Sequence, residues 1–159
     1  AHNNVDTLIN IFNFKFKKYH KLNTSLHVLA PNNYRMSNKI KNDKTIKFYK
    51  NIKKMSKFLV NFDHIVTACG SLSYEINSLG IDCTYITSEP REIKLAKYLD
   101  KKNFGKYFNI NQKKKIFENV QKSLMNNNKK NYLKNKIRYF RHNGLRNILN
   151  LLVNINYEI

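Results

Sequence analysis

The chain is poor in the residues that build tight turns and cross-links. Of its 159 residues, four are glycine, two proline, two cysteine and none tryptophan. So little glycine and proline argues against an all-β protein, whose many turns need those residues. Cys69 and Cys83 are too few for a disulfide scaffold, so we expect reduced thiols and a cytoplasmic location. No apolar run approaches the ~20 residues that cross a bilayer, so we expect no transmembrane segment.

Acidic residues are also scarce, and the imbalance gives a formal net charge of +20. Lysine supplies 25 of the 30 basic residues, and asparagine contributes 26 residues. This composition is typical of codon usage in an AT-rich genome. Proteins that read bases or grip phosphates in a bidentate way usually use arginine. We therefore expect a solvated basic surface with no specific nucleic-acid partner, and keep a basic nucleic-acid-binding domain as an alternative.

The few acids gather in one segment. Residues 63–100 contain six of the ten acids and only three bases, although the whole chain is strongly basic. The same segment holds two of the four glycines and one of the two prolines. If the chain has a ligand site, this segment is where we expect it.

Hydrophobic periodicity predicts strands that alternate with helices. Short apolar or alternating runs predict strands at residues 25–30, 45–49, 64–69, 83–87 and 106–108. Helical spacing of apolar residues predicts helices at residues 5–20, 33–43, 52–62, 71–79, 89–102, 112–125, 132–140 and 145–153. Such alternation is typical of an α/β fold with a Rossmann-like parallel sheet. We expect residues 1–110 to form this domain and residues 111–159 to be its C-terminal helical extension.

The sharpest local signal is a strand, loop and helix with the sequence IVTACGSLSYEINSL at residues 65–79. Gly70 permits a sharp turn, Ser71 is expected to cap the helix, and Ser73 lies in its first turn. Free N–H groups and the helix dipole favour an anion there, at the carboxyl end of a strand. Glu75 is suited to accept hydrogen bonds from sugar hydroxyls. The structural alternative makes Ser71 a plain cap and Glu75 a solvated residue.

The wider segment DHIVTACGSLSYEINSLGIDCTYIT resembles part of the C-terminal nucleotide-sugar domain of the GT-B glycosyltransferase superfamily. It is most similar to the UDP-sugar hydrolase of pseudaminic acid biosynthesis and its spore-coat polysaccharide relatives, which read roughly A-D-x-x-I-S-A-G-G-S-T-x-Y-E-x-x-x-L-G-I-P. KKMSKFLVNFD resembles the preceding family helix, and NGLRNIL resembles a family ending. The resemblance covers about residues 25–149. The matching residues are Asp63, Ala68, Gly70, Ser71, Tyr74, Glu75, Leu79, Gly80 and Ile81.

The resemblance implies a site for UDP or a UDP-sugar. The family's glycine-serine turn holds the diphosphate, a role that falls here on Gly70, Ser71 and Ser73. The helix acid contacts the ribose, which implies Glu75. Uracil is held after the second strand, near Asn51 and Ile52. We expect no cofactor, and the five histidines are scattered with no spacing that suggests a metal site.

Departures from the family pattern put ligand binding in doubt. Cys69 replaces the first glycine of the turn, and Arg91-Glu92 replaces an Asn-Gln pair that contacts sugar or phosphate. Glu92 would repel a diphosphate, although Arg91 offers compensation. A non-catalytic module that has lost its ligand is therefore a second alternative.

Family catalysis also needs an N-terminal half with a base, and 159 residues leave no room for it. We expect the chain to be the C-terminal part of a UDP-sugar hydrolase or glycosyltransferase, with its first strand missing. Its partners would be that N-terminal half and, at exposed sheet edges, a second copy in a homodimer. Alone it should be inert, and no catalytic residue is assigned. For Cys69 and His64 we expect structural roles rather than reactive ones.

Overall fold

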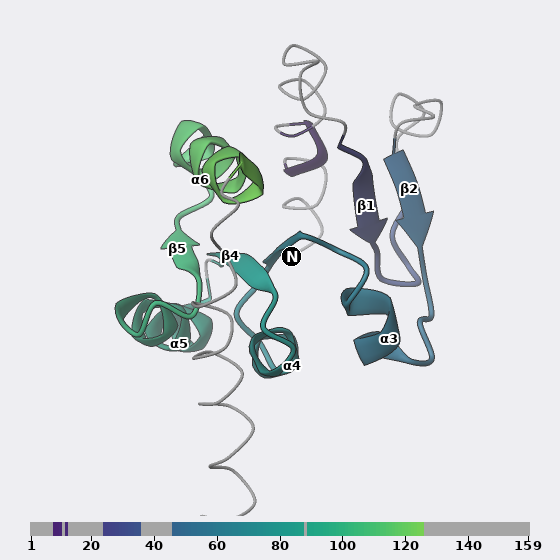
Figure 1. The fold of residues 1–159 in the computed structure, drawn as a ribbon, viewed down its shortest axis with the longest axis horizontal. Helices are drawn as coiled ribbons and strands as arrows, with labels where there is room; N and C mark the ends of the chain where they lie inside the picture. The colour runs from purple at the N-terminus through teal and green to yellow at the C-terminus, as the bar shows by residue number, and fades with distance from the viewer. Residues whose placement is uncertain (1–7, 11, 13–23, 36–45, 88, 126–159) are drawn as a thin grey trace, which may run out of the picture. The chain divides into compact units, whose positions relative to one another are not determined.

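The computed structural model describes residues 8–10, 12, 24–35, 46–87 and 89–125. The chain divides into two compact units, residues 1–58 and 59–159, and each is described by itself. Both contain parallel strands, so the fold is mixed α/β as the sequence predicts (Figure 1).

The first unit is built on two parallel strands, β1 (Leu26–Leu29) and β2 (Ile46–Tyr49). Alternate residues of these strands point to opposite faces. One face carries a buried cluster of apolar side chains, made by Ile9, Ala30, Tyr34 and Ile46 with Leu26, Val28 and Phe48 packed against it. On the other face His27 stacks on Tyr49, and its Nδ1 lies 2.9 Å from the tyrosine hydroxyl.

The loops that follow β1 and β2 are tied together. The Lys50 ammonium donates to the carbonyl oxygens of Asn32 and Tyr34, at 3.2 Å each. Asn51 then adopts a left-handed backbone with φ 54°. The short helix α3 (Met55–Leu59) follows four residues later.

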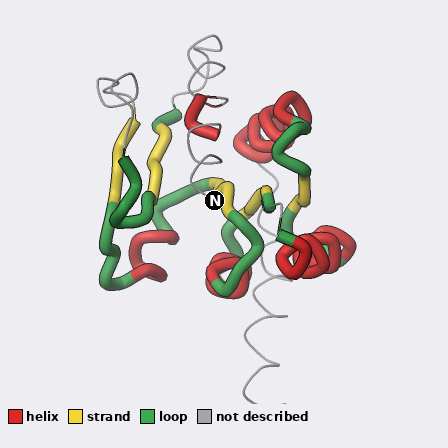
Figure 2. The backbone as a smooth tube through the Cα atoms, turned by 180° about the vertical axis from the view of Figure 1, so that it is seen from behind, coloured by secondary structure: helices red, strands yellow, loops and turns green. Residues whose placement is uncertain are grey.

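The second unit has three layers. Its central sheet contains β3 (His64–Thr67), β4 (Asp82–Ile86) and β5 (Lys106–Phe108), all parallel and in that order. The helices are α4 (Leu72–Ser78), α5 (Pro90–Lys101) and α6 (Lys113–Met125). Figures 1 and 2 show β5 running between α5 and α6.

Side chains alternate between the two faces along β4, and this alternation explains the layers. Tyr85 hydrogen-bonds to a residue of α4, whereas Thr84 hydrogen-bonds to a residue of α6. Successive side chains of the strand therefore face different helices. The buried residues of α6 are Ile116, Phe117 and Val120, which recur at helical spacing and form its apolar side.

Most predicted elements are present, and two predictions need correction. The described strands form two small sheets, where the pattern predicts one. The helix predicted at residues 52–62 is only α3, and after its end the Phe62 N–H closes a turn on Leu59 O at 3.1 Å. The helices predicted at 132–140 and 145–153, and most of those at 5–20 and 33–43, lie outside the described residues.

In the part of the chain that the structure describes, no helix is both long enough and apolar enough to cross a bilayer.

Candidate functional site

Two loops meet at the carboxyl edge of the second sheet. The β3–α4 loop contains Gly70, and the β4–α5 loop runs from Thr87 to the start of α5. A Cβ placed on Gly70 would lie 3.6 Å from Oε1 of Glu92, which projects from the first turn of α5. The Thr87 hydroxyl donates to the other carboxylate oxygen of Glu92, and also accepts the Glu89 N–H at 3.2 Å. The carboxylate is thus held against the glycine turn.

The start of α4 differs from the sequence prediction. Ser71 already has helical dihedral angles, φ −55° and ψ −36°, and its side chain makes no capping hydrogen bond. An N-cap residue needs an extended backbone before its oxygen reaches the next amides, so the predicted cap at Ser71 is wrong. The turn is closed instead by Ser73, whose hydroxyl and N–H both donate to Gly70 O, at 2.6 and 3.0 Å.

Of the groups expected to hold a diphosphate, some already donate hydrogen bonds within the protein and others do not. The Ser73 side chain is fully buried and committed to Gly70 O, so it faces inward. The Tyr74 N–H is bonded to Ser71 O at 3.1 Å. Within the described residues, the amides of Ser71 and Leu72 have no backbone acceptor. These two amides, beside Gly70, are the donors that the turn offers to an anion.

The remaining candidate residues are dispersed. Glu75 lies on α4 and is partly buried, and Arg91 lies on α5 and is exposed. No ion pair joins Arg91 to Glu92 within the described ranges. Asn51 and Ile52 follow β2 and therefore belong to the first unit. The structure thus brings Gly70, Ser71, Ser73 and Glu92 together, and leaves Arg91 outside that group.

Cys69 lies at the centre of the turn, and its surroundings disfavour a reactive thiol. It is 1% exposed, and burial raises the pKa of its thiol to about 11, against a partial lowering by a hydrogen bond with Ser73. Only the thiolate is nucleophilic. The structural role predicted for Cys69 is therefore the one that its surroundings favour.

Cys69 should consequently resist alkylation in the folded chain. With a pKa of about 11, roughly 0.1% of the thiol is ionised at pH 8, about a hundredfold less than with its ordinary pKa of 9.0. The measurement is the rate of iodoacetamide labelling at pH 8, read for each cysteine by peptide mass, with and without denaturing urea. Equal labelling rates for Cys69 in the two conditions would contradict this assignment.

A buried polar cluster behind the turn was not predicted from the sequence. The Asn77 amide donates to Ser73 O and to the Tyr85 hydroxyl, both at 2.7 Å. Tyr85 donates to Phe104 O at 3.3 Å, and the Cys83 thiol lies 3.0 Å from the tyrosine oxygen. Burial raises the pKa of Tyr85, so its hydroxyl stays protonated. The cluster fixes α4, and with it the turn, to β4 and to the loop between α5 and β5.

A second polar network joins the sheet to α6. His64 Nδ1 lies 2.9 Å from Ser123 Oγ, and Ser123 donates its proton to Asp82. His64 Nε2 lies 2.9 Å from Thr84 Oγ1, which also accepts from Asn119 at 2.9 Å. Since the serine proton points to Asp82, His64 Nδ1 must donate to Ser123.

That network does not form a nucleophilic triad. The hydroxyl that faces the second ring nitrogen belongs to Thr84, which is fully buried and out of reach of a substrate. The side chain of His64 is itself only 3% exposed. Its polar neighbours therefore support the structural role predicted for it. No three His, Cys, Asp or Glu side chains of the described residues gather as metal ligands.

Comparison with known protein families, with curated proteins and with solved structures finds no match to this chain.

Proposed function

We propose that the second unit binds the diphosphate of a nucleotide sugar, UDP or a UDP-sugar, at the turn between β3 and α4. The observation that carries the proposal is the meeting of two strand–helix loops at one edge of a parallel sheet, around Gly70 and Glu92. Open α/β sheets bind ligands at this edge, outside the carboxyl ends of their strands. The choice of UDP comes from the resemblance to the GT-B nucleotide-sugar domain.

In the proposed complex the protein positions the diphosphate and stabilises its charge. The amides of Ser71 and Leu72 donate to phosphate oxygens, and the small Gly70 lets the phosphate approach the backbone. In a complete hydrolase or transferase, the same donors would stabilise the departing phosphate while another domain supplies the base. Glu75 would contact the ribose. Asn51 and Ile52, which the resemblance places near the uracil, belong to the first unit and take no part in this proposal.

Glu92 should weaken UDP binding because its carboxylate lies beside Gly70, where we propose that the phosphate binds. Glu92→Gln keeps an oxygen for the Thr87 hydroxyl and removes one negative charge beside Gly70. We expect UDP affinity to rise about fivefold to tenfold, since one like charge at about 4 Å costs about 1 kcal/mol even in water. Calorimetric titration with UDP measures the change, and uridine without phosphate should bind equally to both proteins.

The matched control is Glu118→Gln, which makes the same charge change at an exposed position of α6. It should leave UDP affinity unchanged. The proposal fails if neither the wild type nor Glu92→Gln is stabilised by millimolar UDP. That result would favour a module of the same fold that has lost its ligand.

A further inference from the structure

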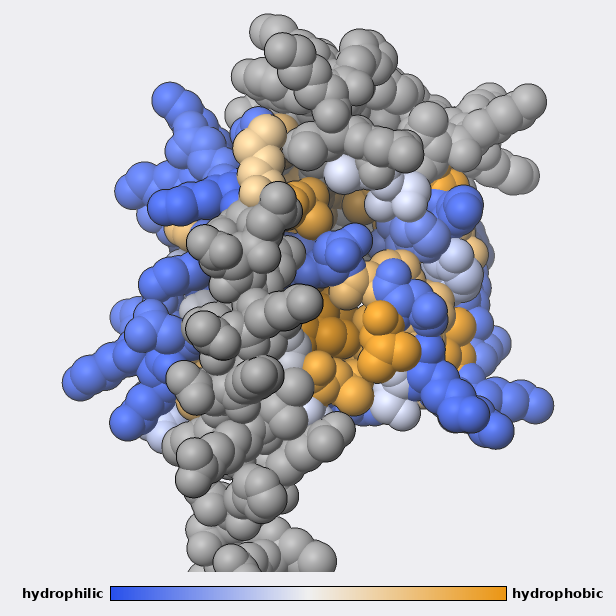
Figure 3. All heavy atoms as spheres, viewed as in Figure 1, coloured by the Kyte–Doolittle hydropathy of each residue, from blue (hydrophilic) through white to orange (hydrophobic). Residues whose placement is uncertain are grey.

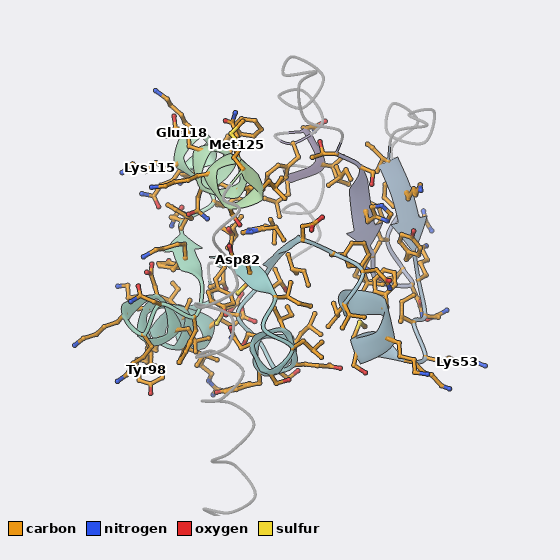
Figure 4. The ribbon with its side chains drawn as sticks, in the orientation of Figure 1. Lys53, Asp82, Tyr98, Lys115, Glu118 and Met125 are labelled. Atoms are coloured by element: carbon orange, nitrogen blue, oxygen red, sulfur yellow. The ribbon has the colours of Figure 1, made fainter. Side chains whose placement is uncertain are left out.

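The exposed side of α5 carries a uniform positive charge around an exposed aromatic ring. Lys94, Lys97, Tyr98 and Lys101 fall within about 100° of arc around the helix axis, at 3.6 residues per turn. We call these four residues the α5 basic face. The three lysines are exposed, and the tyrosine is 46% exposed. Figure 4 shows Tyr98 projecting from α5, and Figure 3 shows hydrophilic side chains over α5 and α6.

The acids of α5 do not neutralise this face because both are used elsewhere. Glu92 turns toward Thr87 and Gly70. Asp100 pairs with Lys106 at 2.8 Å and also accepts the Tyr107 N–H at 3.0 Å. Within the described residues, none of the three lysines forms an ion pair. The segment with the most acids in the chain thus still presents an all-positive helix side.

From this arrangement we infer that the α5 basic face binds single-stranded nucleic acid without sequence preference. Lysines along one helix side are point charges that attract successive phosphates, and an exposed tyrosine ring stacks on an unpaired base. Lysine presents a compact point charge on a flexible stem and lacks the rigid planar fork of arginine, so no sequence preference is expected. This activity is separate from the proposed diphosphate site, which lies on the loops and uses none of these four residues.

The chemistry of α5 disfavours an acidic membrane surface as the occupant. A helix that lies in a membrane interface needs an apolar side to insert among the lipids. The apolar residues of α5 face the sheet instead, and Ala96 and Leu99 are buried at 0% and 1% exposure. Charge alone would also attract any polyanion, and the tyrosine is the feature that distinguishes a ligand with bases.

The first experiment compares two triple variants that remove the same charge. Lys94→Gln/Lys97→Gln/Lys101→Gln changes the α5 basic face, and Lys113→Gln/Lys115→Gln/Lys122→Gln changes exposed positions of α6. Binding of a fluorescent oligothymidine is followed by anisotropy over a range of salt concentrations. Affinity falls as salt rises, so the plot of log affinity against log salt has a negative slope. The α5 variant should make this slope shallower by about 2, while the α6 variant changes it by less than about 0.7. Equal losses for both triples would overturn the proposal in favour of diffuse charge attraction.

The second experiment tests the ring. Tyr98→Ala should weaken binding to oligothymidine about tenfold. It should not change binding to heparin, which has charge but no bases. Tyr74→Ala, at a 50% exposed tyrosine of α4, is the control and should have no effect on either ligand.

Further outcomes separate this inference from the alternatives. An unchanged oligothymidine affinity in Tyr98→Ala overturns it, and so does tighter binding to vesicles of anionic lipid than to the oligonucleotide. Millimolar UDP should not displace the oligonucleotide, so failure of the diphosphate site leaves this result intact. Circular dichroism melting of each variant shows that the loss is not unfolding.

Discussion

Gly105→Ala is expected to destabilise the second unit by roughly 3 kcal/mol, the upper end of typical overpacking costs. A Cβ at this position would lie 2.5 Å from Cε2 of Tyr85, 2.7 Å from Sγ of Cys83 and 3.0 Å from Cys83 O. One of these atoms is backbone and the others are buried side chains held by hydrogen bonds. At these distances something must shift, so we expect the segment that leads into β5 to move away from β4.

Urea unfolding at neutral pH measures this effect, and Gly70→Ala is its control. A Cβ on Gly70 meets only Oε1 of Glu92, at an ordinary contact distance of 3.6 Å. That variant should change the free energy of unfolding by less than about 1 kcal/mol, because the alanine also restricts the unfolded chain. If both variants unfold at the same urea concentration, the close approach of Gly105 to β4 is not as described.

Asn77→Asp is expected to cost about 3–5 kcal/mol at neutral pH, as an uncompensated buried charge does. Asn77 is fully buried, and its amide nitrogen donates to Ser73 O and to the Tyr85 hydroxyl. The substituted carboxylate keeps the shape but loses both donors, and it places a charged acceptor beside the Ser73 carbonyl. The loss of unfolding free energy should be smaller in acid, where a protonated carboxyl again donates one hydrogen bond.

The measurement is urea unfolding at pH 7 and at pH 4.5. Asn111→Asp, at an exposed position, makes the same change of charge, and its free energy of unfolding should stay within about 0.5 kcal/mol of the wild type. A small loss for Asn77→Asp at pH 7 would show that water reaches this position.

The strands were the part of the fold most predictable from sequence. β5 has its predicted bounds, and the other four strands differ from theirs by one or two residues. Their runs are short, apolar and bounded by polar residues, so local patterning suffices to find them. How strands assemble into sheets depends on residues that are distant in sequence. The pattern therefore predicts one sheet, whereas the described strands form two.

Candidate site residues were harder to predict because their partners are distant in sequence. Gly70 and Glu92 were both selected from the sequence, but nothing in it shows that the carboxylate lies against the glycine turn. Ser71 and Ser73 are alike in sequence, and only the backbone angles decide which of them closes the turn. His64 and Ser123 are 59 residues apart, so no spacing rule links them.

Asn51 and Asn103 have φ values of 54° and 59°, and they are the two non-glycine residues with positive φ in the described ranges. Asparagine tolerates this left-handed backbone better than most residues because its short amide bonds locally. In a chain with four glycines and 26 asparagines, asparagine therefore makes bends that glycine makes elsewhere. A genome drifting toward A and T loses glycine codons and gains asparagine codons. This backbone tolerance is one route by which a folded chain absorbs that drift.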